Sequence, residues 1–274
     1  MKSSSSLRVL FRAPAGARRG FGHLVRCLSL ARALGVRPLI ALRGRADAAD
    51  VALALGAELI SSPTRRTLRA LAPDVVVIDD PVAGSARRWI AAARRAGAIV
   101  VTIHDLGLGA PEGDLVIDGS ATRAARGRKG TVSLAGSRYA LLDPRIAALR
   151  SDIRPELIPV ARTLSDSRGE PDKARPTRSD SKTGNLDKTV VISLGGGPHA
   201  QTAEAIADVA IVGGGMSLYE ACAMGVPAAA LPVVAAQTPT VRAFAQRGAA
   251  IAMPAGAQAR EAADAAVVSL TQRG

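Results

Sequence analysis

The residues best suited to chemistry in this sequence lie in a short glycine-rich segment near its start. Gly20 and Gly22 stand on either side of one phenylalanine, and His23 follows at once. Glycines let the backbone turn tightly and approach a ligand, and the N-terminus of a following helix favours an anion. A histidine, with an ordinary pKa near about 6.5, can accept a proton at neutral pH. We predict that His23 is a general base and that Gly20 and Gly22 bind substrate; the alternative is that His23 only caps the helix.

Three more polar residues of the same half are candidates for substrate binding. Arg26 follows His23 by one helical turn and can pair with a phosphate or with an acid of its own domain. Asp79 and Asp80 end the apolar run DVVVI, where they can orient His23 or bind sugar hydroxyls. The alternative for the two acids is ordinary turn formation before the next proline.

A second cluster follows the apolar run VAIV in the last third of the chain. Three glycines before a helix N-terminus can cradle a diphosphate, and Ser217 can cap that helix or bind a phosphate oxygen. Glu220 can accept the two hydroxyls of a ribose, or it can complement the helix dipole as a first-turn acid. Another glycine turn follows the run VVISL, and Gln237 is a further polar candidate. The predicted nucleotide-binding residues are Gly195, Gly196, Gly213, Gly214, Gly215, Met216, Ser217, Glu220 and Gln237.

The elements that position these residues alternate between strand and helix. In the first half, apolar and β-branched runs predict strands, and Ala-rich stretches between them predict helices. This rhythm is typical of βαβ units and a parallel sheet, which binds ligands at the carboxyl ends of its strands. We therefore expect His23, Asp79 and the pair His104–Asp105 at one rim. The predicted strands are 7–11, 38–42, 74–78, 98–103 and 114–117, and the predicted helices are 23–34, 46–55 and 85–96.

A polar segment divides the sequence into two parts. Residues 162–188 hold Ser, Asp, Arg, Lys and Pro with almost nothing apolar, which is typical of a linker or a disordered loop. The predicted organisation is an N-terminal Rossmann-like domain at 1–161, this linker, and a short C-terminal nucleotide-binding domain at 189–274. In the last domain we expect strands at 189–194, 209–212, 228–231 and 249–252. Between the first two, 195–208 has room for a single crossover helix.

Composition narrows the classes of partner. The formal charge of +13 invites an anionic ligand, but aromatic residues are only 2% of the chain, too few for a nucleic-acid stacking platform. Cys27 and Cys222 stand apart, as in a reducing compartment, and no metal-ligand spacing is present. No apolar run approaches about 18 residues. We expect a cytoplasmic protein, monomeric and without membrane insertion, that needs no metal or other cofactor and binds a phosphorylated metabolite rather than nucleic acid.

Several segments resemble a known family. The motif Gly-x-Gly-His-x-x-Arg-Cys-Leu-x-Leu-Ala, at 20–31, resembles the signature of the UDP-2,4-diacetamido-2,4,6-trideoxy-sugar hydrolases of pseudaminic acid biosynthesis, which spore-coat polysaccharide proteins share. The segment SRYALLDP at 137–144 is similar to the part of that family before its domain crossover. The segment GGGMSLYEACAMGVP at 213–227 resembles the wider GT-B clan, which includes the peptidoglycan N-acetylglucosaminyl transferase.

This resemblance implies a fold and an activity. The fold would be α/β and GT-B-like, with two Rossmann-like parallel-sheet domains facing a cleft and the second domain truncated. His23 would activate water at the anomeric carbon, the turn 213–217 would hold the diphosphate, and Glu220 the ribose. The reaction would release UDP from a UDP-linked 2,4-diacetamido sugar in surface-glycan or nonulosonic acid biosynthesis. Two alternatives remain: a GT-B glycosyltransferase with a UDP-sugar donor, and a degenerate, non-catalytic nucleotide-sugar binding protein.

The sequence departs from the family pattern in three places. Ala13 and Pro14 follow Arg12, where the family has an acid. Pro81 follows the aspartate pair, where the family has a tyrosine. The second domain is shorter than in the family, and the missing units would carry contacts to the nucleotide base.

Overall fold

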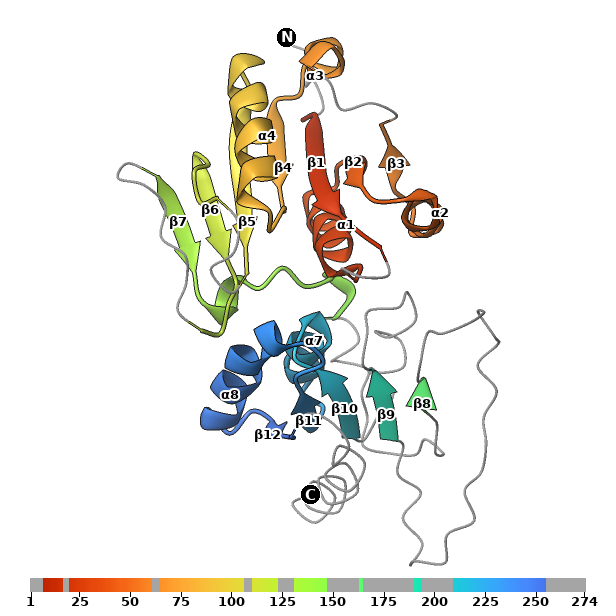
Figure 1. The fold of residues 1–274 in the computed structure, drawn as a ribbon, viewed down its shortest axis with the longest axis vertical. Helices are drawn as coiled ribbons and strands as arrows, with labels where there is room; N and C mark the ends of the chain where they lie inside the picture. The colour runs from red at the N-terminus through yellow and green to blue at the C-terminus, as the bar shows by residue number, and fades with distance from the viewer. Residues whose placement is uncertain are drawn as a thin grey trace, which may run out of the picture. The chain divides into compact units, whose positions relative to one another are not determined.

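The chain folds into two compact units, each built on a parallel sheet (Figure 1). The units are Met1–Pro144 and Arg145–Gly274. The computed structural model describes residues 7–16, 20–60, 65–105, 110–122, 131–146, 163–164, 190–193 and 209–254. No helix within these residues is long and apolar enough to cross a membrane.

The first unit is built on a seven-stranded sheet in which all neighbouring strands are parallel. The order is β3-β2-β1-β4-β5-β6-β7, so the direction of progress across the sheet reverses between β1 and β4. Ligands of open α/β sheets bind at such a reversal, beyond the carboxyl ends of the strands. The strands are β1 (Val9–Pro14), β2 (Leu39–Arg43), β3 (Glu58–Leu59), β4 (Val75–Ile78), β5 (Ile99–His104), β6 (Leu115–Asp118) and β7 (Val132–Ala135).

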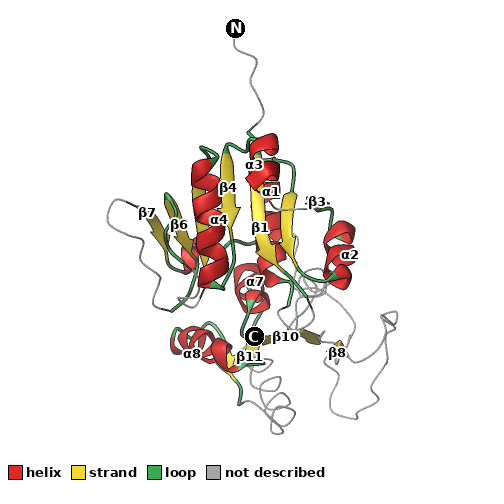
Figure 2. Cartoon of the chain, turned by 45° about the horizontal axis from the view of Figure 1, so that its top comes forward, coloured by secondary structure: helices red, strands yellow, loops and turns green. Residues whose placement is uncertain are grey.

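Helices cover both faces of this sheet (Figure 2). Because side chains alternate along a strand, Phe11 and Ala13 of β1 pack with α1 and α2, whereas Leu10 packs with α3 and α4. The same alternation governs β4, where Val77 lies on the α1 face and Ile78 on the α4 face. The helices are α1 (Gly22–Leu34), α2 (Ala46–Ala54), α3 (Arg65–Leu71) and α4 (Ala83–Arg95), and a 3₁₀ turn, η1, spans Ser137–Tyr139.

The second unit holds a smaller parallel sheet with the order β12-β11-β10-β9-β8. Its described core gathers Ile211, Ala229, Leu231 and Met253. The strands are β8 (Thr163–Leu164), β9 (Val190–Ser193), β10 (Val209–Gly213), β11 (Ala228–Leu231) and β12 (Ile251–Ala252). The helical elements are α7 (Met216–Met224), the 3₁₀ turn η2 (Ala235–Gln237) and α8 (Thr238–Gln246). Tyr219 of α7 meets Phe244 of α8 edge to face, with ring centroids 4.8 Å apart.

The alternation of strands and helices confirms the predicted α/β class, and the structure differs from the predicted organisation around the polar segment. Strand β8 lies inside 162–188, which composition marks as a linker, and it pairs in parallel with β9 through Thr163 and Ile192. Main-chain hydrogen bonds hold such an edge strand, so side-chain composition does not reveal it. The boundary between the units falls after Pro144 rather than after residue 161. Residues 165–189 lie outside the described part of the chain.

Candidate functional site

The loop between β1 and α1 brings the predicted base to the reversal point of the first sheet. Gly16 N donates a hydrogen bond to Gly20 O over 3.3 Å, which closes the loop. Gly20 has a φ of +71°, in the left-handed region where a residue without Cβ is unstrained. Helix α1 then begins at Gly22, and no side chain caps it. The alternative that His23 serves as a helix cap is therefore wrong.

Arg26 grips Asp79 with two parallel hydrogen bonds. Its Nε donates to Asp79 Oδ2 and its Nη2 to Asp79 Oδ1, each over 2.9 Å, and its Nη1 donates to Asp105 Oδ2 over 3.2 Å. The side chains of Arg26 and Asp79 are 7% and 2% exposed. Arg26 was predicted to pair with a phosphate or with an acid of its own domain, and the structure shows the acid. The guanidinium nitrogens of Arg26 are bound by two acids of its own unit, Asp79 and Asp105. The geometry therefore favours a role for Arg26 in positioning Asp79 over the predicted role in binding substrate.

The electrostatics of this pair keep both groups charged. Burial by itself would raise the pKa of Asp79, but the charges of Arg26 and His23 and their hydrogen bonds outweigh it, so the pKa lies below its ordinary value. Burial would lower the pKa of Arg26, but Asp79 and Asp105 raise it above its ordinary value. Asp79 is therefore ionised at neutral pH, and its carboxylate places a negative charge at the rim of the sheet.

His23 is oriented by that oxygen. Its Nδ1 lies 2.7 Å from Asp79 Oδ1, and the histidine side chain is 20% exposed. An ionised carboxylate only accepts, so Nδ1 carries the proton and donates it to Asp79; Arg26 Nη2, 2.9 Å from Nδ1, shares the same acceptor. With the proton on Nδ1, the lone pair of the ring is on Nε2, and the described residues offer Nε2 no hydrogen-bond donor. This arrangement resembles the acid and histidine of a catalytic triad, in which the acid orients the ring.

The side chains of Asp79 and Asp80 lie on opposite faces of the sheet. Successive residues of a strand point to opposite sides, so Asp79 turns toward α1 and Asp80 toward α4. Asp80 accepts hydrogen bonds from Arg43 Nη2 (2.5 Å), Ser85 Oγ (2.7 Å) and Val82 N (3.0 Å). Its side chain is fully buried, and these bonds outweigh the effect of burial and lower its pKa. The prediction that Asp80 binds substrate is thus corrected: its carboxylate closes the start of α4.

Both aspartates make stability depend on pH in acid. Their pKa values are lower in the folded protein than the unfolded value of about 3.9. Such groups bind fewer protons when folded, so their contribution to stability is complete above the unfolded pKa and is lost as pH falls through the folded pKa. We expect the urea midpoint to hold between pH 7 and 5 and to fall steeply below about pH 4. A midpoint unchanged down to pH 3 would contradict the ion pairs seen here.

The predicted nucleotide turn lies at the carboxyl end of β10 in the second unit. Gly213 is the last residue of β10, and Gly215 precedes the first residue of α7, Met216. Gly214 N donates to Leu231 O over 3.0 Å, so this amide extends the sheet and is not available to a phosphate. The role predicted for Gly214 is corrected accordingly, and the amides that open α7 stay the predicted cradle.

Three polar residues of the second unit were predicted to bind nucleotide near this turn. Glu220 is buried, and the first turn of α7 contains no acid, so the helix-dipole alternative for Glu220 is wrong. Ser217 is buried without capping the helix. Gln237 Oε1 accepts from Val233 N over 2.9 Å, which fixes the turn that packs on Gly214. Gly195 and Gly196 lie outside the described residues.

Gly214 has a packing role that a substitution can test. A Cβ at Gly214 would lie 2.5 Å from Val241 Cγ2 and 3.0 Å from Gln237 Cβ. We expect Gly214→Ala to lower the unfolding free energy by about 1–3 kcal/mol, because the buried start of α8 must move. Gly84→Ala is the matched control, since its Cβ meets nothing within 4 Å and Gly84 lies in α4. Equal urea midpoints for the two variants would contradict the close approach.

Comparison with solved structures defines the class of fold. The chain has a GT-B-like α/β fold. It is similar to the crystal structure of LpCGTa in complex with UDP, with a TM-score of 0.57 and 11% identity over 97% of this chain and 93% of that one. It is also similar to the spinosyn rhamnosyltransferase SpnG complexed with spinosyn aglycone, with a TM-score of 0.51 and 13% identity over 97% and 92%.

The sequence comparison gives one short match. A stretch of 50 residues is 52% identical to the spore coat polysaccharide biosynthesis protein SpsG of Bacillus subtilis (strain 168). The match spans 18% of this chain and 15% of that relative. No family model matches the chain.

Proposed function

We propose that this chain is a sugar-transferring enzyme that takes a UDP-sugar as donor and passes the sugar to an acceptor hydroxyl. The observation that carries the proposal is the oriented histidine: His23 lies at the rim of a parallel sheet, with Nδ1 held by Asp79 and a side chain that is 20% exposed. A base placed in this way, on a GT-B-like fold, suits removal of a proton from an attacking hydroxyl.

The proposed reaction moves the donor sugar to an acceptor hydroxyl. In the first unit, the acceptor oxygen loses its proton to His23 Nε2 and forms a bond to the anomeric carbon of the donor sugar. The bond from that carbon to the diphosphate oxygen breaks, and the electron pair leaves with UDP. Asp79 stabilises the imidazolium that results, as the acid of a catalytic triad does. In the second unit, the amides that open α7 can stabilise a diphosphate, because the first turn of this helix holds no acid.

Several findings support the donor class. The amide cradle at Gly215–Ser217 fits a diphosphate, and buried Glu220 lies within two turns of it. LpCGTa, which shares the fold, is described in complex with UDP, and SpsG is described as a polysaccharide biosynthesis protein. We infer that the product belongs to a surface polysaccharide.

A second candidate is hydrolysis of the same donor. Water would take the place of the acceptor hydroxyl at His23, with no other change in the site. The glycine–histidine motif at 20–31 favours this candidate, because it resembles the signature of UDP-diacetamido-sugar hydrolases.

One assay separates the candidates. Purified protein is incubated with UDP-N-acetylglucosamine, or with a UDP-diacetamido sugar, with and without a panel of sugar acceptors, and released UDP is measured. Release that depends on an acceptor supports transfer, and equal release in buffer alone supports hydrolysis. If calorimetry detects UDP binding but no UDP is released under any condition, the protein is a non-catalytic binding protein and the proposal fails.

A further inference from the structure

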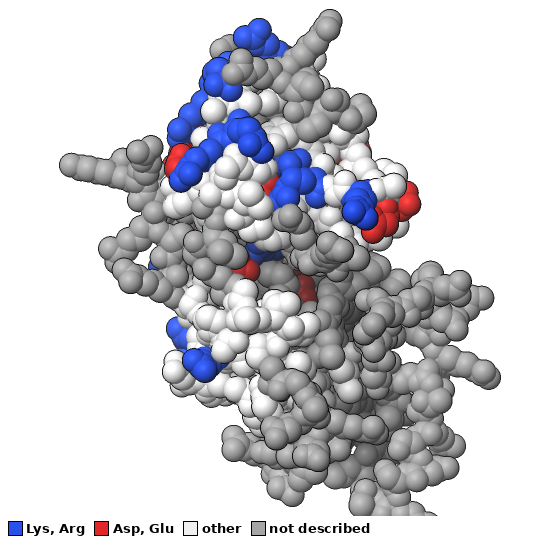
Figure 3. Space-filling view, viewed as in Figure 1, with Lys and Arg blue, Asp and Glu red and all other residues white. Residues whose placement is uncertain are grey.

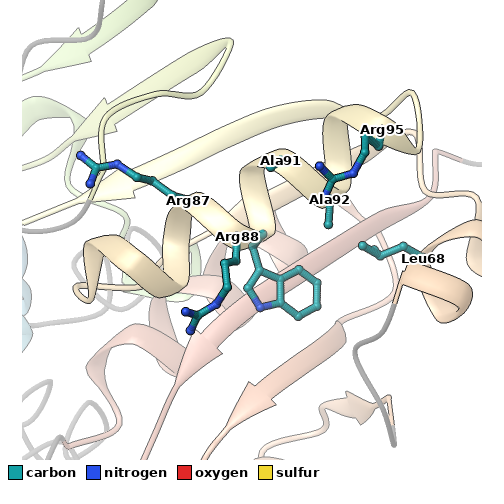
Figure 4. Close-up of a pocket in the computed structure, with 7 residues that line it drawn as sticks. Leu68, Arg87, Arg88, Ala91, Ala92 and Arg95 are labelled. Atoms are coloured by element: carbon teal, nitrogen blue, oxygen red, sulfur yellow. The ribbon is translucent and has the colours of Figure 1, made fainter.

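A shallow hollow on the outer surface of α4 lies apart from the candidate site. Its volume is about 520 Å³, and its walls come from α3 and α4 (Figure 4). Helix α4 covers the face of the sheet opposite to α1, and the His23 site belongs to the α1 face. The hollow is lined by Leu68, Arg87, Arg88, Trp89, Ala91, Ala92 and Arg95.

The arginines of α4 fall into two pairs with different surroundings. Arg87 Nε lies 2.8 Å from Glu112 Oε1, and Arg94 pairs with Asp114 at 3.6 Å, so the loop before β6 neutralises both. Arg88 and Arg95 are exposed and form no ion pair with any described residue. Figure 3 shows arginine side chains gathered over this part of the first unit. Within the described part of the chain, the α4 surface therefore presents two cations without counter-charges.

The geometry of these two cations matches a helical partner. Arg88 and Arg95 are seven residues apart on one helix, which places their Cα atoms about 10.5 Å apart along the axis. In Figure 4 Arg88 and Arg95 stand apart along α4, and Arg87 points away from Leu68. Trp89 and Leu68 line the same hollow. Two carboxylates seven residues apart on a helix laid along α4 have the same spacing.

The floor of the hollow is apolar and recessed. Trp89 is 8% exposed and Leu68 is buried. The guanidinium of buried Arg12 lies 5.0 Å from the centre of the indole and holds it from the core side. A ligand must bring a protruding apolar group to reach this floor. A membrane surface is disfavoured, because no large apolar side chain of the hollow protrudes to enter lipid.

We propose that the hollow on α4 docks an acidic amphipathic helix of a partner protein. Carboxylates one heptad apart pair with Arg88 and Arg95, and an apolar side chain of the same helix face enters the hollow over Trp89 and Leu68. In this mode of recognition an amphipathic helix lies in an apolar groove, here with one ion pair at each end of the groove. The docking would hold the enzyme beside a partner without covering the His23 site.

Trp89 provides the readout, because it is the one tryptophan of the chain. The probe is a helical peptide of about 14 residues with Glu at two positions seven apart and Leu at the intervening third and fourth positions. Titration of the full chain should change the Trp89 fluorescence saturably. The same peptide with Gln in place of Glu should bind about tenfold more weakly in low salt, because two exposed ion pairs are lost.

Matched variants of α4 decide the result. Arg88→Gln with Arg95→Gln should weaken the Glu peptide about tenfold, whereas Arg87→Gln with Arg94→Gln removes the same charge from the same helix and should change affinity less than about threefold. Three results would overturn the proposal: no saturable fluorescence change, equal losses in the two double variants, or Arg88- and Arg95-dependent binding to phosphatidylglycerol vesicles in place of the peptide. The last result would identify a membrane surface as the occupant.

Discussion

Replacing His23 with alanine is expected to lower kcat for UDP release by about 10²–10⁴-fold, the range attributed to general-base catalysis. The reason is that Nε2 of His23 is the proton acceptor in the proposed transfer, with Nδ1 fixed 2.7 Å from Asp79 Oδ1. The UDP affinity should stay the same, because the amide cradle belongs to the second unit. Initial rates at saturating donor and calorimetric titration with UDP measure the two quantities.

The His23→Ala variant should keep its fold, since Arg26 retains both hydrogen bonds to Asp79. A urea midpoint equal to that of the wild-type chain checks this directly. His23→Gln is a useful companion variant, because glutamine keeps a polar side chain of similar length but cannot act as a base near neutral pH. Undiminished kcat in either variant would remove His23 from the mechanism. Loss of UDP binding together with activity would point to a structural role instead.

Replacing Asp79 with alanine is expected to cost about 3–5 kcal/mol of unfolding free energy, because it breaks a buried ion pair and leaves the charge of its partner in place. Arg26 is 7% exposed and would lose both hydrogen bonds of its fork, keeping the bond of Nη1 to Asp105. Urea unfolding followed by circular dichroism gives the change.

Two comparisons make this second prediction specific. The double variant Arg26→Leu with Asp79→Leu should recover most of the loss, since an apolar pair in place of a buried ion pair is often neutral. Asp105→Asn should cost much less than Asp79→Ala, because the side chain of Asp105 is 34% exposed and Arg26 keeps its fork. A cost for Asp79→Ala below about 1 kcal/mol would mean that water or another group replaces the carboxylate. That result would weaken the account of how His23 is oriented.

The parts of the fold that sequence reasoning recovered are those with strong local signals. Apolar runs such as 74–78 and 98–103 predicted strands β4 and β5, and the intervening Ala- and Arg-rich stretch predicted α4. The elements α3, β3, β7 and β8 were not predicted, and of these β3 and β8 have two residues each, too short for a hydrophobic period. Strand β8 is also hidden in polar composition, since backbone pairing with β9 does not require apolar side chains.

In the candidate site, too, residues marked by a local pattern were predicted, and contacts between distant residues were not. His23 and Asp79 were predicted from a glycine loop and from an acid at a strand end, and the structure brings them together across 56 residues of sequence. Asp105 was placed at the same rim but not selected, and its contact with Arg26 spans 79 residues. No local sequence pattern indicates a contact between residues so far apart in the sequence. Asp105 could have been found only by assuming that β4 and β5 are neighbours, which the sheet order then shows.

The sequence by itself determined the alternation of strands and helices, the glycine turns and the kinds of side chain at the strand ends, because these depend on neighbours a few residues away. The tertiary structure alone decided what each polar residue does. Asp79 and Asp80 are adjacent and chemically identical, yet one orients His23 and the other is sealed beneath α4 by Arg43 and Ser85. The cause is physical: a strand turns successive side chains to opposite faces, and only the packed sheet determines which helix covers each face.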